Sequence, residues 1–258
     1  MLENLMNPTL ELIHQHGSCR RYKPDPLPAT VIETIVGAGQ RASTSSNLQT
    51  YSVIAVTDGV KREQLSELCG QQQHIAEAPL FLAFCADLAR MERISQLRGY
   101  TQVADQTENF LIATLDAGIV AQNTALAAQS LGLGICYIGA IRNNPREVIE
   151  LLGLPKLVFP ITGMTVGYPA RQVRQRPRLP LREILHMEQY HAPIDEALAE
   201  YDQDMIDTGI YKNRQVPVPG KPEEVEEYGW MEHSARRSLQ VLRPFLREVL
   251  EEQGFALK

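Results

Sequence analysis

The sequence predicts a mixed α and β domain in which one sheet is covered by helices. Two observations lead to this class: short apolar runs, and one long segment of helical periodicity between them. Residues 80–86 and 135–141 are almost entirely apolar, which is typical of strands buried on both faces. Residues 105–131 repeat small apolar side chains at spacings of three and four, which is the period of a helix.

The first third of the chain predicts one helix and one further strand. Thr30 and Glu33 have the spacing of a capping box, so we expect a helix over residues 30–41. The polar run at 43–47 interrupts this pattern. Residues 51–57 are rich in β-branched side chains and precede an Asp-Gly pair, so they predict a strand that ends in a turn.

The long helical segment carries a stripe of small side chains. Asp105 and Glu108 have capping-box spacing at its start, and Gly132 and Gly134 end it. Small residues on one face allow another helix to approach closely. The stripe fits either an ordinary core helix or a subunit interface, and its members are Ala113, Ala117, Ala121, Ala125 and Ala128.

The rest of the chain alternates strands and helices and then loses its regular pattern. A helix is expected from Pro145, and a strand over 159–168. Helical periodicity returns at 194–210, followed by a proline-rich acidic stretch at 211–230 that predicts a mobile surface loop. The last segment predicts an amphipathic helix at 233–253, kinked at its proline.

No linker separates two domains, so we expect residues 1–258 to form a single domain. Its peripheral parts would be a mobile excursion at 194–230 and the C-terminal helix.

Composition excludes several classes of function. The formal net charge of -6 argues against a nucleic-acid binder. No apolar run suggests a membrane span, and the first residues lack the pattern of a secretory signal. The four cysteines form no CxxC pair, so neither a zinc site nor a disulfide framework is expected. These features predict a cytoplasmic protein.

Two compact basic segments stand out in this acidic chain. One is His16-Gly-Ser-Cys-Arg-Arg-Tyr22, and the other extends from Arg171 to Arg178. Guanidinium groups stay charged and donate paired hydrogen bonds to phosphate oxygens. The two segments therefore predict a site for a small, multiply charged anion such as a phosphate, although each alone could equally be a solvated surface.

No motif for a protein nucleophile or a metal accompanies this anion site. The chain has no G-x-S-x-G elbow, no P-loop and no H-E-x-x-H pair. An enzyme without such groups can leave its chemistry to an organic cofactor.

Six motifs occur in an order and spacing that resemble the FMN-dependent nitroreductase family. The resemblance is to its NADPH-preferring branch of oxygen-insensitive nitroreductases and flavin reductases, and it covers nearly the whole chain. The motifs are His16-x-Ser18-x-Arg20, Ser43-x-Ser45-Ser46-Asn47-Leu48-Gln49, Gly70-x-Gln72-x-His74-Ile-Ala, Gly132-Leu-Gly134-x-x-Tyr137-Ile-Gly139, Arg142-Asn-Asn144 and Pro177-Arg178-Leu-Pro180.

The resemblance implies an α+β fold with a mostly antiparallel central sheet wrapped by helices, in an intertwined homodimer. It also implies one FMN at each of two interface sites. His16, Ser18 and Arg20 would hold the phosphate and ribityl chain, and Arg176 and Arg178 would complete the phosphate site. This assignment agrees with the anion site expected from charge alone.

The same resemblance assigns residues to the flavin ring. Gln72 would hydrogen-bond it, and Ser45 would contact the cofactor across the subunit boundary. Tyr137, Ile138 and Gly139 would lie along the isoalloxazine, with backbone N–H groups directed at its N5/O4 edge. Donors there stabilise negative charge on the reduced ring.

The chain departs from the family pattern at three positions. Ala140 replaces a second glycine, and Arg176 replaces a lysine. Gly17 stands where relatives can carry arginine.

The implied activity is NAD(P)H oxidation coupled to reduction of nitroaromatics, quinones or related flat acceptors, by ping-pong hydride transfer. Arg214 would pair with the 2′-phosphate of NADPH, or be a free surface cation. Other functions remain open: a flavin reductase supplying free reduced flavin, a non-catalytic flavin-binding or redox-sensing protein, and a phosphate-binding module unrelated to flavin.

Overall fold

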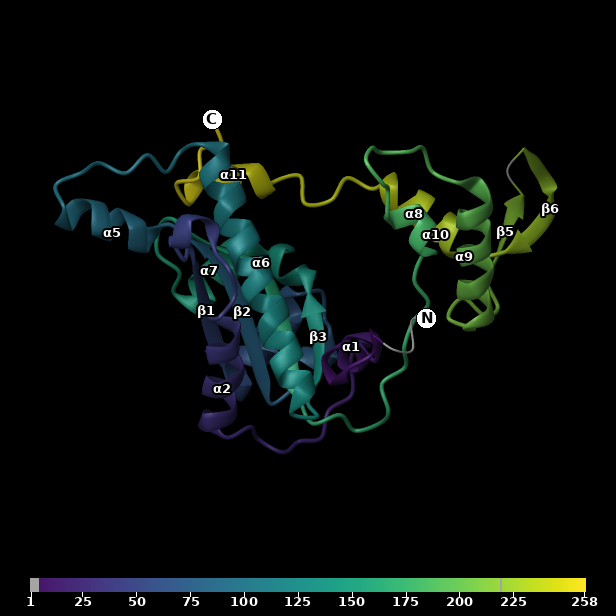
Figure 1. Cartoon of the computed structure of the whole chain (residues 1–258), viewed down its shortest axis with the longest axis horizontal. Coiled ribbons are helices and arrows are strands. Elements are labelled where there is room, and N and C mark those ends of the chain that lie inside the picture. The colour runs from purple at the N-terminus through teal and green to yellow at the C-terminus, as the bar shows by residue number, and fades with distance from the viewer. Residues whose placement is uncertain (1–4, 219) are drawn as a thin grey trace. The chain divides into compact units, whose positions relative to one another are not determined.

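The chain forms two compact units in the computed structural model, which describes residues 5–218 and 220–258. Unit 1 contains the described residues up to Arg174 together with Arg243–Lys258, and unit 2 is Gln175–Leu242 (Figure 1). The chain thus leaves unit 1, forms unit 2 and returns. Each unit is described by itself below.

Unit 1 is built on a four-stranded antiparallel sheet in the order β1-β2-β4-β3. The strands are β1 (Tyr51–Val56), β2 (Leu80–Asp87), β3 (Gly134–Ile138) and β4 (Val158–Gly167). Every strand pair is antiparallel. The expected antiparallel sheet with helices around it is confirmed, and β3 lies at one edge (Figure 1).

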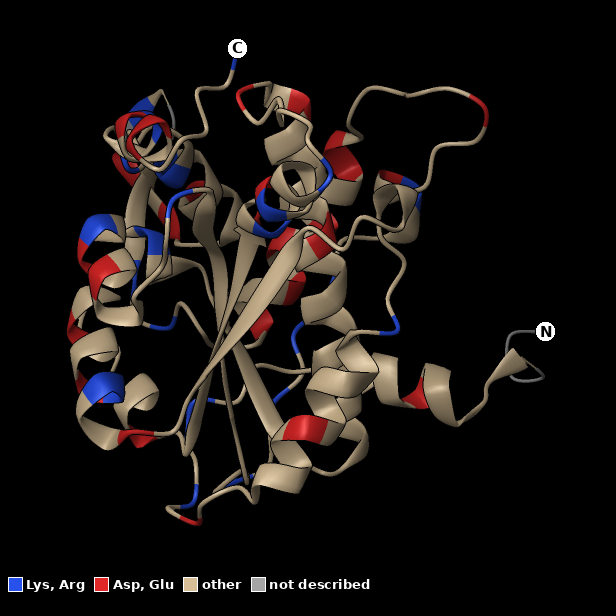
Figure 2. Ribbon diagram, turned by 90° about the vertical axis from the view of Figure 1, so that its left-hand side faces the viewer, with Lys and Arg blue, Asp and Glu red and all other residues tan. Residues whose placement is uncertain are grey.

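The central strand β2 is a continuous apolar run because side chains on both of its faces are buried. Leu80, Leu82 and Phe84 belong to one hydrophobic cluster, whereas Phe81 and Ala83 belong to another. Successive side chains of a strand point to opposite faces, so both faces of the sheet are covered. Charged residues are accordingly found on the helices and loops around the sheet, whose strands are nearly free of them (Figure 2).

Helices pack on both faces of this sheet. The first face is covered by α2 (Ala29–Gly39) and α6 (Thr107–Ser130), and the second by α3 (Gly59–Leu68), α4 (Gln73–Glu77) and α7 (Pro145–Leu152). The remaining helices of unit 1 are α1 (Pro8–His14), α5 (Ala89–Leu97), α11 (Leu246–Glu252) and the short 3-10 turns η2 (Ser45–Asn47) and η3 (Gly139–Arg142).

The alanine stripe of α6 is a core face. All five of its alanines are fully buried, and the neighbouring helix is α2 of the same chain. Gly39 of α2 lies so close to Thr124 of α6 that a Cβ at that position would overlap it. The core-helix interpretation of the stripe therefore holds, and the close approach is made within one chain.

Helix α6 is long and apolar enough to cross a membrane by length and composition alone, although the sequence predicted no membrane span. The helix packs with its buried face against the sheet and α2, which makes it a core helix.

The expected capping boxes are also wrong. Helix α2 begins after Pro28, with Thr30 already inside its first turn, and α6 begins after Gln106; neither has a side-chain cap. Asp105 instead pairs with Lys258, whose Nζ lies 2.5 Å from Oδ2. The strand expected at 135–141 is shorter than expected, because the chain turns into η3 at Gly139.

Unit 2 consists of α8 (Leu181–Ile184), α9 (Asp195–Asp207), α10 (Trp230–Ser238) and a hairpin of β5 (Gln215–Val218) and β6 (Lys221–Glu227). The stretch 211–230 was expected to be a loop, and most of it forms this hairpin instead. Pro217 is tolerated because a two-stranded sheet consists only of edge strands.

The single C-terminal helix expected at 233–253 is two helices, α10 in unit 2 and α11 in unit 1. Residues 239–245 between them are not helical, and Arg243 has a φ of 52°. Because a proline disfavours helical geometry at the preceding residue, Pro244 separates the helices where a kink was expected.

Candidate functional site

The first basic segment runs along the free edge of β3 in unit 1. Cys19 N donates to Ile135 O at 2.8 Å, and Tyr22 Oη donates to Cys19 O at 2.7 Å. Cys19 and Tyr22 are buried, while Ser18 and Arg20 are exposed. This alternation, typical of an extended segment, places Ser18 and Arg20 on the same open face.

The beginning of the second basic segment packs against the first. A Cβ on Gly17 would lie 2.6 Å from Val173 Cγ1 and 2.7 Å from Arg174 O, so only glycine fits there. Arg20 and Arg171 both act electrostatically on the thiol of Cys19. Unit 1 by itself therefore brings cations from both basic segments close together, and the close approach explains the glycine at position 17.

Arg20 lies in a small polar cluster at the edge of the sheet. Its side chain and that of Ser18 reach the thiol of Cys136 on β3, whose pKa is nevertheless raised because burial dominates. Arg20 also acts on His74 of α4. No ion pair involving Arg20 is found among the described residues, so its charge is left for a ligand or for solvent.

His74 of α4 is the imidazole of this cluster. Burial, and then the charge of Arg20, lower the pKa of its imidazole, with Glu77 opposing and Arg21 adding to this effect. Its Nε2 is buried and has no hydrogen-bond partner in the described part of the chain. Gln72, just before α4, donates from Nε2 to Cys69 O at 2.7 Å, which orients its side chain.

The end of β3 carries the three consecutive residues assigned to the flavin ring. Tyr137 Oη donates to Gln122 Oε1 at 3.1 Å, and burial raises the pKa of this phenol to about 12. Ile138 is buried in the core. A Cβ on Gly139 would have Arg142 Nη2, 3.7 Å away, as its nearest neighbour, so packing within the chain does not demand a glycine here.

Two arginines surround the turn at Gly139, and sequence reasoning gave neither of them a role. Arg243 donates from Nη2 to Gly139 O at 3.1 Å and from Nε to Asn143 Oδ1 at 3.1 Å. Arg142 donates to Ile161 O, and its pKa is lowered by burial and then by the charge of Arg243. Arg142 occurs in one of the motifs that resemble the family, which was the available signal for this turn.

The structure does not bring Ser45 to this cluster within one chain. Ser45 N donates to Asp116 of α6 at 3.0 Å, whereas His16 Nδ1 lies 3.3 Å from Gln129 Oε1 near the end of that helix. A rise of 1.5 Å per residue separates Asp116 from Gln129 by about 20 Å along α6. His16 therefore lies near the Arg20 segment, and Ser45 lies far along the helix.

Unit 2 carries the other three arginines assigned to ligands. Arg178 folds back on its own backbone, donating to Arg176 O at 3.0 Å and to Pro177 O at 3.1 Å. Arg214 lies 5.7 Å from the ring centre of Tyr228. It lines a pocket of about 640 Å³ with Lys212, Tyr211 and Tyr228, and Arg176 acts electrostatically on Tyr211.

Comparison with known proteins covers both units. Residues 13–168 match the model of the nitroreductase family, and residues 176–258 match that of its C-terminal domain. The chain is 37% identical to an FMN reductase (NADPH) of Bacillus subtilis, over 97% of this chain and 99% of that protein. It is 37% identical to an oxygen-insensitive NADPH nitroreductase of Salmonella typhimurium, over 98% and 100% of the two chains.

The solved structure of NfrA2 from B. megaterium superimposes with a TM-score of 0.90 at 35% identity, covering 98% of this chain and 100% of that one. These matches confirm the resemblance expected from the motifs. The chain therefore belongs to the nitroreductase family of oxidoreductases.

Proposed function

We propose that this protein is an FMN-dependent NAD(P)H oxidoreductase that holds the phosphate of FMN on Arg20. The observation that carries the proposal is the Arg20 cluster of unit 1. There an exposed guanidinium that has no ion pair within the described chain adjoins the Nε2 of His74, which has no partner there either. A phosphate would supply acceptors to both groups. Ser18, His16 and Gln72 would bind the rest of the flavin from the same unit.

The residues at the end of β3 fit a flat ring. A Cβ on Gly139 would meet no described atom closer than Arg142 Nη2 at 3.7 Å, so packing does not require this glycine, and without a side chain its backbone can approach a ligand closely. Bound FMN would supply the hydride-transfer chemistry between NADPH and a second substrate. The positive charges of Arg142 and Arg243 would stabilise negative charge on a ring bound beside Gly139. Tyr137 would remain a neutral phenol because burial raises its pKa.

The remaining assignments concern Arg176, Arg178, Ser45 and the subunit arrangement. We assign Arg176 and Arg178 to the FMN phosphate and Ser45 to the flavin of a second copy. The distance of about 20 Å along α6 between the anchors of Ser45 and His16 supports a role in another subunit's site. An exposed apolar stripe on α6, opposite its alanines, supports a homodimer; its members are Leu111, Leu115 and Ile119.

The two substrates of a ping-pong cycle would be NADPH and then a flat acceptor, with nitroaromatics and quinones as acceptor classes. The relatives named as NADPH-dependent enzymes support the choice of nicotinamide. Arg214 would pair with the 2′-phosphate, with the aromatic rings of Tyr211 and Tyr228 beside it. We expect the enzyme to act in the cytoplasm.

An absorbance spectrum of the purified protein, followed by stopped-flow mixing with NADPH, tests this function. We expect flavin bands after purification or after addition of FMN, and bleaching by NADPH that an added nitrofuran reverses. A protein that takes up no FMN would contradict the proposal. Flavin bands that NADPH does not bleach would favour a non-catalytic flavin-binding protein.

The second candidate function is supply of free reduced flavin, and the relative named FMN reductase (NADPH) favours it. Comparing turnover on free FMN with turnover on a nitrofuran separates the two functions. A catalytic efficiency at least about tenfold higher with FMN, equivalent to about 1.4 kcal/mol of transition-state stabilisation, would assign the protein to flavin supply.

A further inference from the structure

The loop that carries Ser45 adopts a strained backbone conformation. Three of its residues, none of them glycine, have positive φ: Ser46 at 48°, Asn47 at 57° and Gln49 at 55°. Non-glycine residues rarely occupy this left-handed region, and they persist there only where surrounding contacts hold them. The loop from Ser45 to Thr50 therefore needs anchors.

A buried carboxylate joins the two ends of this loop. Asp116 on α6 is only 2% exposed. Its Oδ1 accepts a hydrogen bond from Ser45 N at 3.0 Å, and its Oδ2 accepts from Thr50 N at 3.1 Å and from Thr50 Oγ1 at 2.8 Å. One side chain thus binds the first and last residues of the strained segment through separate oxygens.

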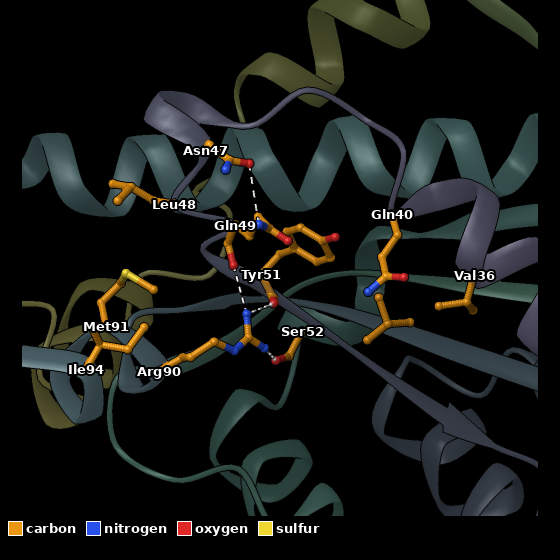
Figure 3. Close-up of a pocket in the computed structure, with 11 residues that line it drawn as sticks. Val36, Gln40, Asn47, Leu48, Gln49, Tyr51, Ser52, Arg90, Met91 and Ile94 are labelled. Atoms are coloured by element: carbon orange, nitrogen blue, oxygen red, sulfur yellow. Dashed lines mark hydrogen bonds between the residues drawn. The ribbon is translucent and has the colours of Figure 1, made fainter. Parts of the chain in front are cut away.

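Arg90 of α5 anchors the same loop from the other side. Its Nη1 donates to Gln49 O at 2.8 Å and to Tyr51 O at 3.2 Å, and its Nη2 donates to Ser52 Oγ at 3.0 Å. Figure 3 shows the guanidinium directed at these three residues. The exit of the loop into β1 is therefore fixed, and Asp116 determines where the Ser45 end lies.

We propose that Asp116 is a positioning residue of the flavin site, which holds the 45–50 loop in the conformation that presents Ser45 to the cofactor. The inference rests on the proposed function, because it takes Ser45 as a flavin contact. A loop ordered before binding loses less conformational entropy when the ligand arrives. Asp116 would thus affect FMN affinity although it lies beneath the loop and does not touch FMN.

Three variants remove different numbers of the hydrogen bonds between Asp116 and the loop. Asp116→Ala removes all three acceptor contacts, and Asp116→Asn leaves one oxygen, which can serve Ser45 or Thr50 but not both. Thr50→Val removes a single contact and keeps the backbone N–H, so it should fold even where the others do not. We expect FMN affinity to fall about tenfold or more in Asp116→Ala, less in Asp116→Asn, and about threefold in Thr50→Val.

Amide hydrogen exchange of residues 44–52 provides a readout that is independent of FMN. We expect faster exchange in the same order, measured on the apoprotein. Thr124→Val is the matched control, since Thr124 is a buried α6 residue whose hydroxyl bonds only Val120 O, at 2.9 Å, among the contacts of the described chain. It should leave both loop exchange and FMN affinity unchanged.

The outcomes separate this inference from the proposed function. Faster loop exchange with FMN affinity within twofold of wild type would show that Asp116 only stabilises the fold and would overturn the inference. Unchanged loop exchange in Asp116→Asn would overturn it as well. If the wild-type protein failed to bind FMN, the proposed function and the flavin role of Asp116 would both fall, although exchange would still report whether Asp116 holds the loop.

Discussion

The candidate ligand-binding residues of unit 1 lie on a packed core, whereas those of unit 2 lie in a region with few buried hydrophobic residues. In unit 1 both faces of a four-stranded sheet are covered, and Arg20, His74 and Gly139 lie on or beside strands and helices of that core. In unit 2 the buried hydrophobic residues of the described chain are few, namely Ala197, Tyr201, Met205 and Val216. Segments with little buried apolar contact open more readily than a packed core.

This difference suggests a division of labour. A cofactor that stays bound through many turnovers benefits from groups that are already in position, which unit 1 offers. Substrates that enter and leave in every cycle benefit from a region that changes conformation more easily, and unit 2 is such a region. Variants in unit 1 should therefore affect FMN binding or stability. Variants in unit 2 should affect the nicotinamide, except at Arg176 and Arg178, which are assigned to the FMN phosphate.

The largest effect is expected from Arg20→Ala. Loss of a charge-assisted hydrogen bond to phosphate should weaken FMN binding about 100-fold, equivalent to about 2.7 kcal/mol. Arg21→Ala is the control, because Arg21 is an exposed residue whose recorded ion pair, with Glu77, is 3.8 Å long, and such pairs contribute little. Fluorescence titration of the apoprotein measures both, and equal losses in the two variants would remove Arg20 from its assigned role.

A pair of glycine substitutions separates stability from binding within unit 1. A Cβ at Gly134 would lie 2.6 Å from Cys19 Cβ, so Gly134→Ala should destabilise the fold by about 1–3 kcal/mol. Gly139→Ala meets no such contact and should change stability by no more than about 0.5 kcal/mol, while FMN affinity falls about tenfold. Urea unfolding and FMN titration of each variant provide the measurement. Full FMN affinity in Gly139→Ala would show that this backbone does not approach the ring.

A smaller, selective effect is expected in unit 2. Arg214→Ala should raise KM for NADPH about tenfold and leave KM for NADH and FMN affinity unchanged, because only NADPH carries the 2′-phosphate. Lys212→Ala is the matched cation control from the same pocket. Steady-state kinetics with both nicotinamides decide the matter, and an equal rise in both KM values would contradict phosphate recognition by Arg214.

The smallest effect concerns the pH dependence of stability. The pKa of His74 in the folded protein is lowered below the ordinary value of 6.5, chiefly by burial, so the folded state holds fewer protons than the unfolded state below that pH. Its stabilising contribution is fully present above pH 6.5, begins to fall at that pH, and is lost as the pH falls through the lower pKa of the folded state. His74→Gln should therefore lose less stability than wild type between about pH 7.5 and 5.5, measured as Tm in the apoprotein; parallel curves would contradict this. Bound FMN should reduce the difference, since a phosphate favours the imidazolium.

Sequence patterns predicted those parts of unit 1 in which buried side chains fill both faces of a strand or recur at the spacing of a helix. The run at 80–86 is apolar on both faces, and α6 repeats alanine every three or four residues, so both were recognised. Helices α3 and α5 were missed because they bury little: Leu65 and Ser66 are the buried residues of α3, and α5 has none.

The candidate site was predictable where its residues cluster locally. Ser18 and Arg20 lie two residues apart, and Tyr137 to Gly139 are consecutive. His74 and Arg243 reach the same region through contacts distant in sequence, and no local pattern reports such contacts. In unit 2 the prolines and acidic residues of 211–230 resemble a loop in composition, but cross-strand pairing makes them a hairpin.

The central claim is that arginines from both basic segments bind the phosphate of one FMN. Its most direct test is the affinity of the apoprotein for FMN and for riboflavin, which lacks the phosphate, in wild type, Arg20→Ala, Arg178→Ala and the double variant. The account predicts that each single variant loses much of the preference for FMN, and that the two losses are not additive, as expected for groups sharing one ligand. Full preference for FMN in Arg178→Ala, or equal binding of FMN and riboflavin by wild type, would contradict it.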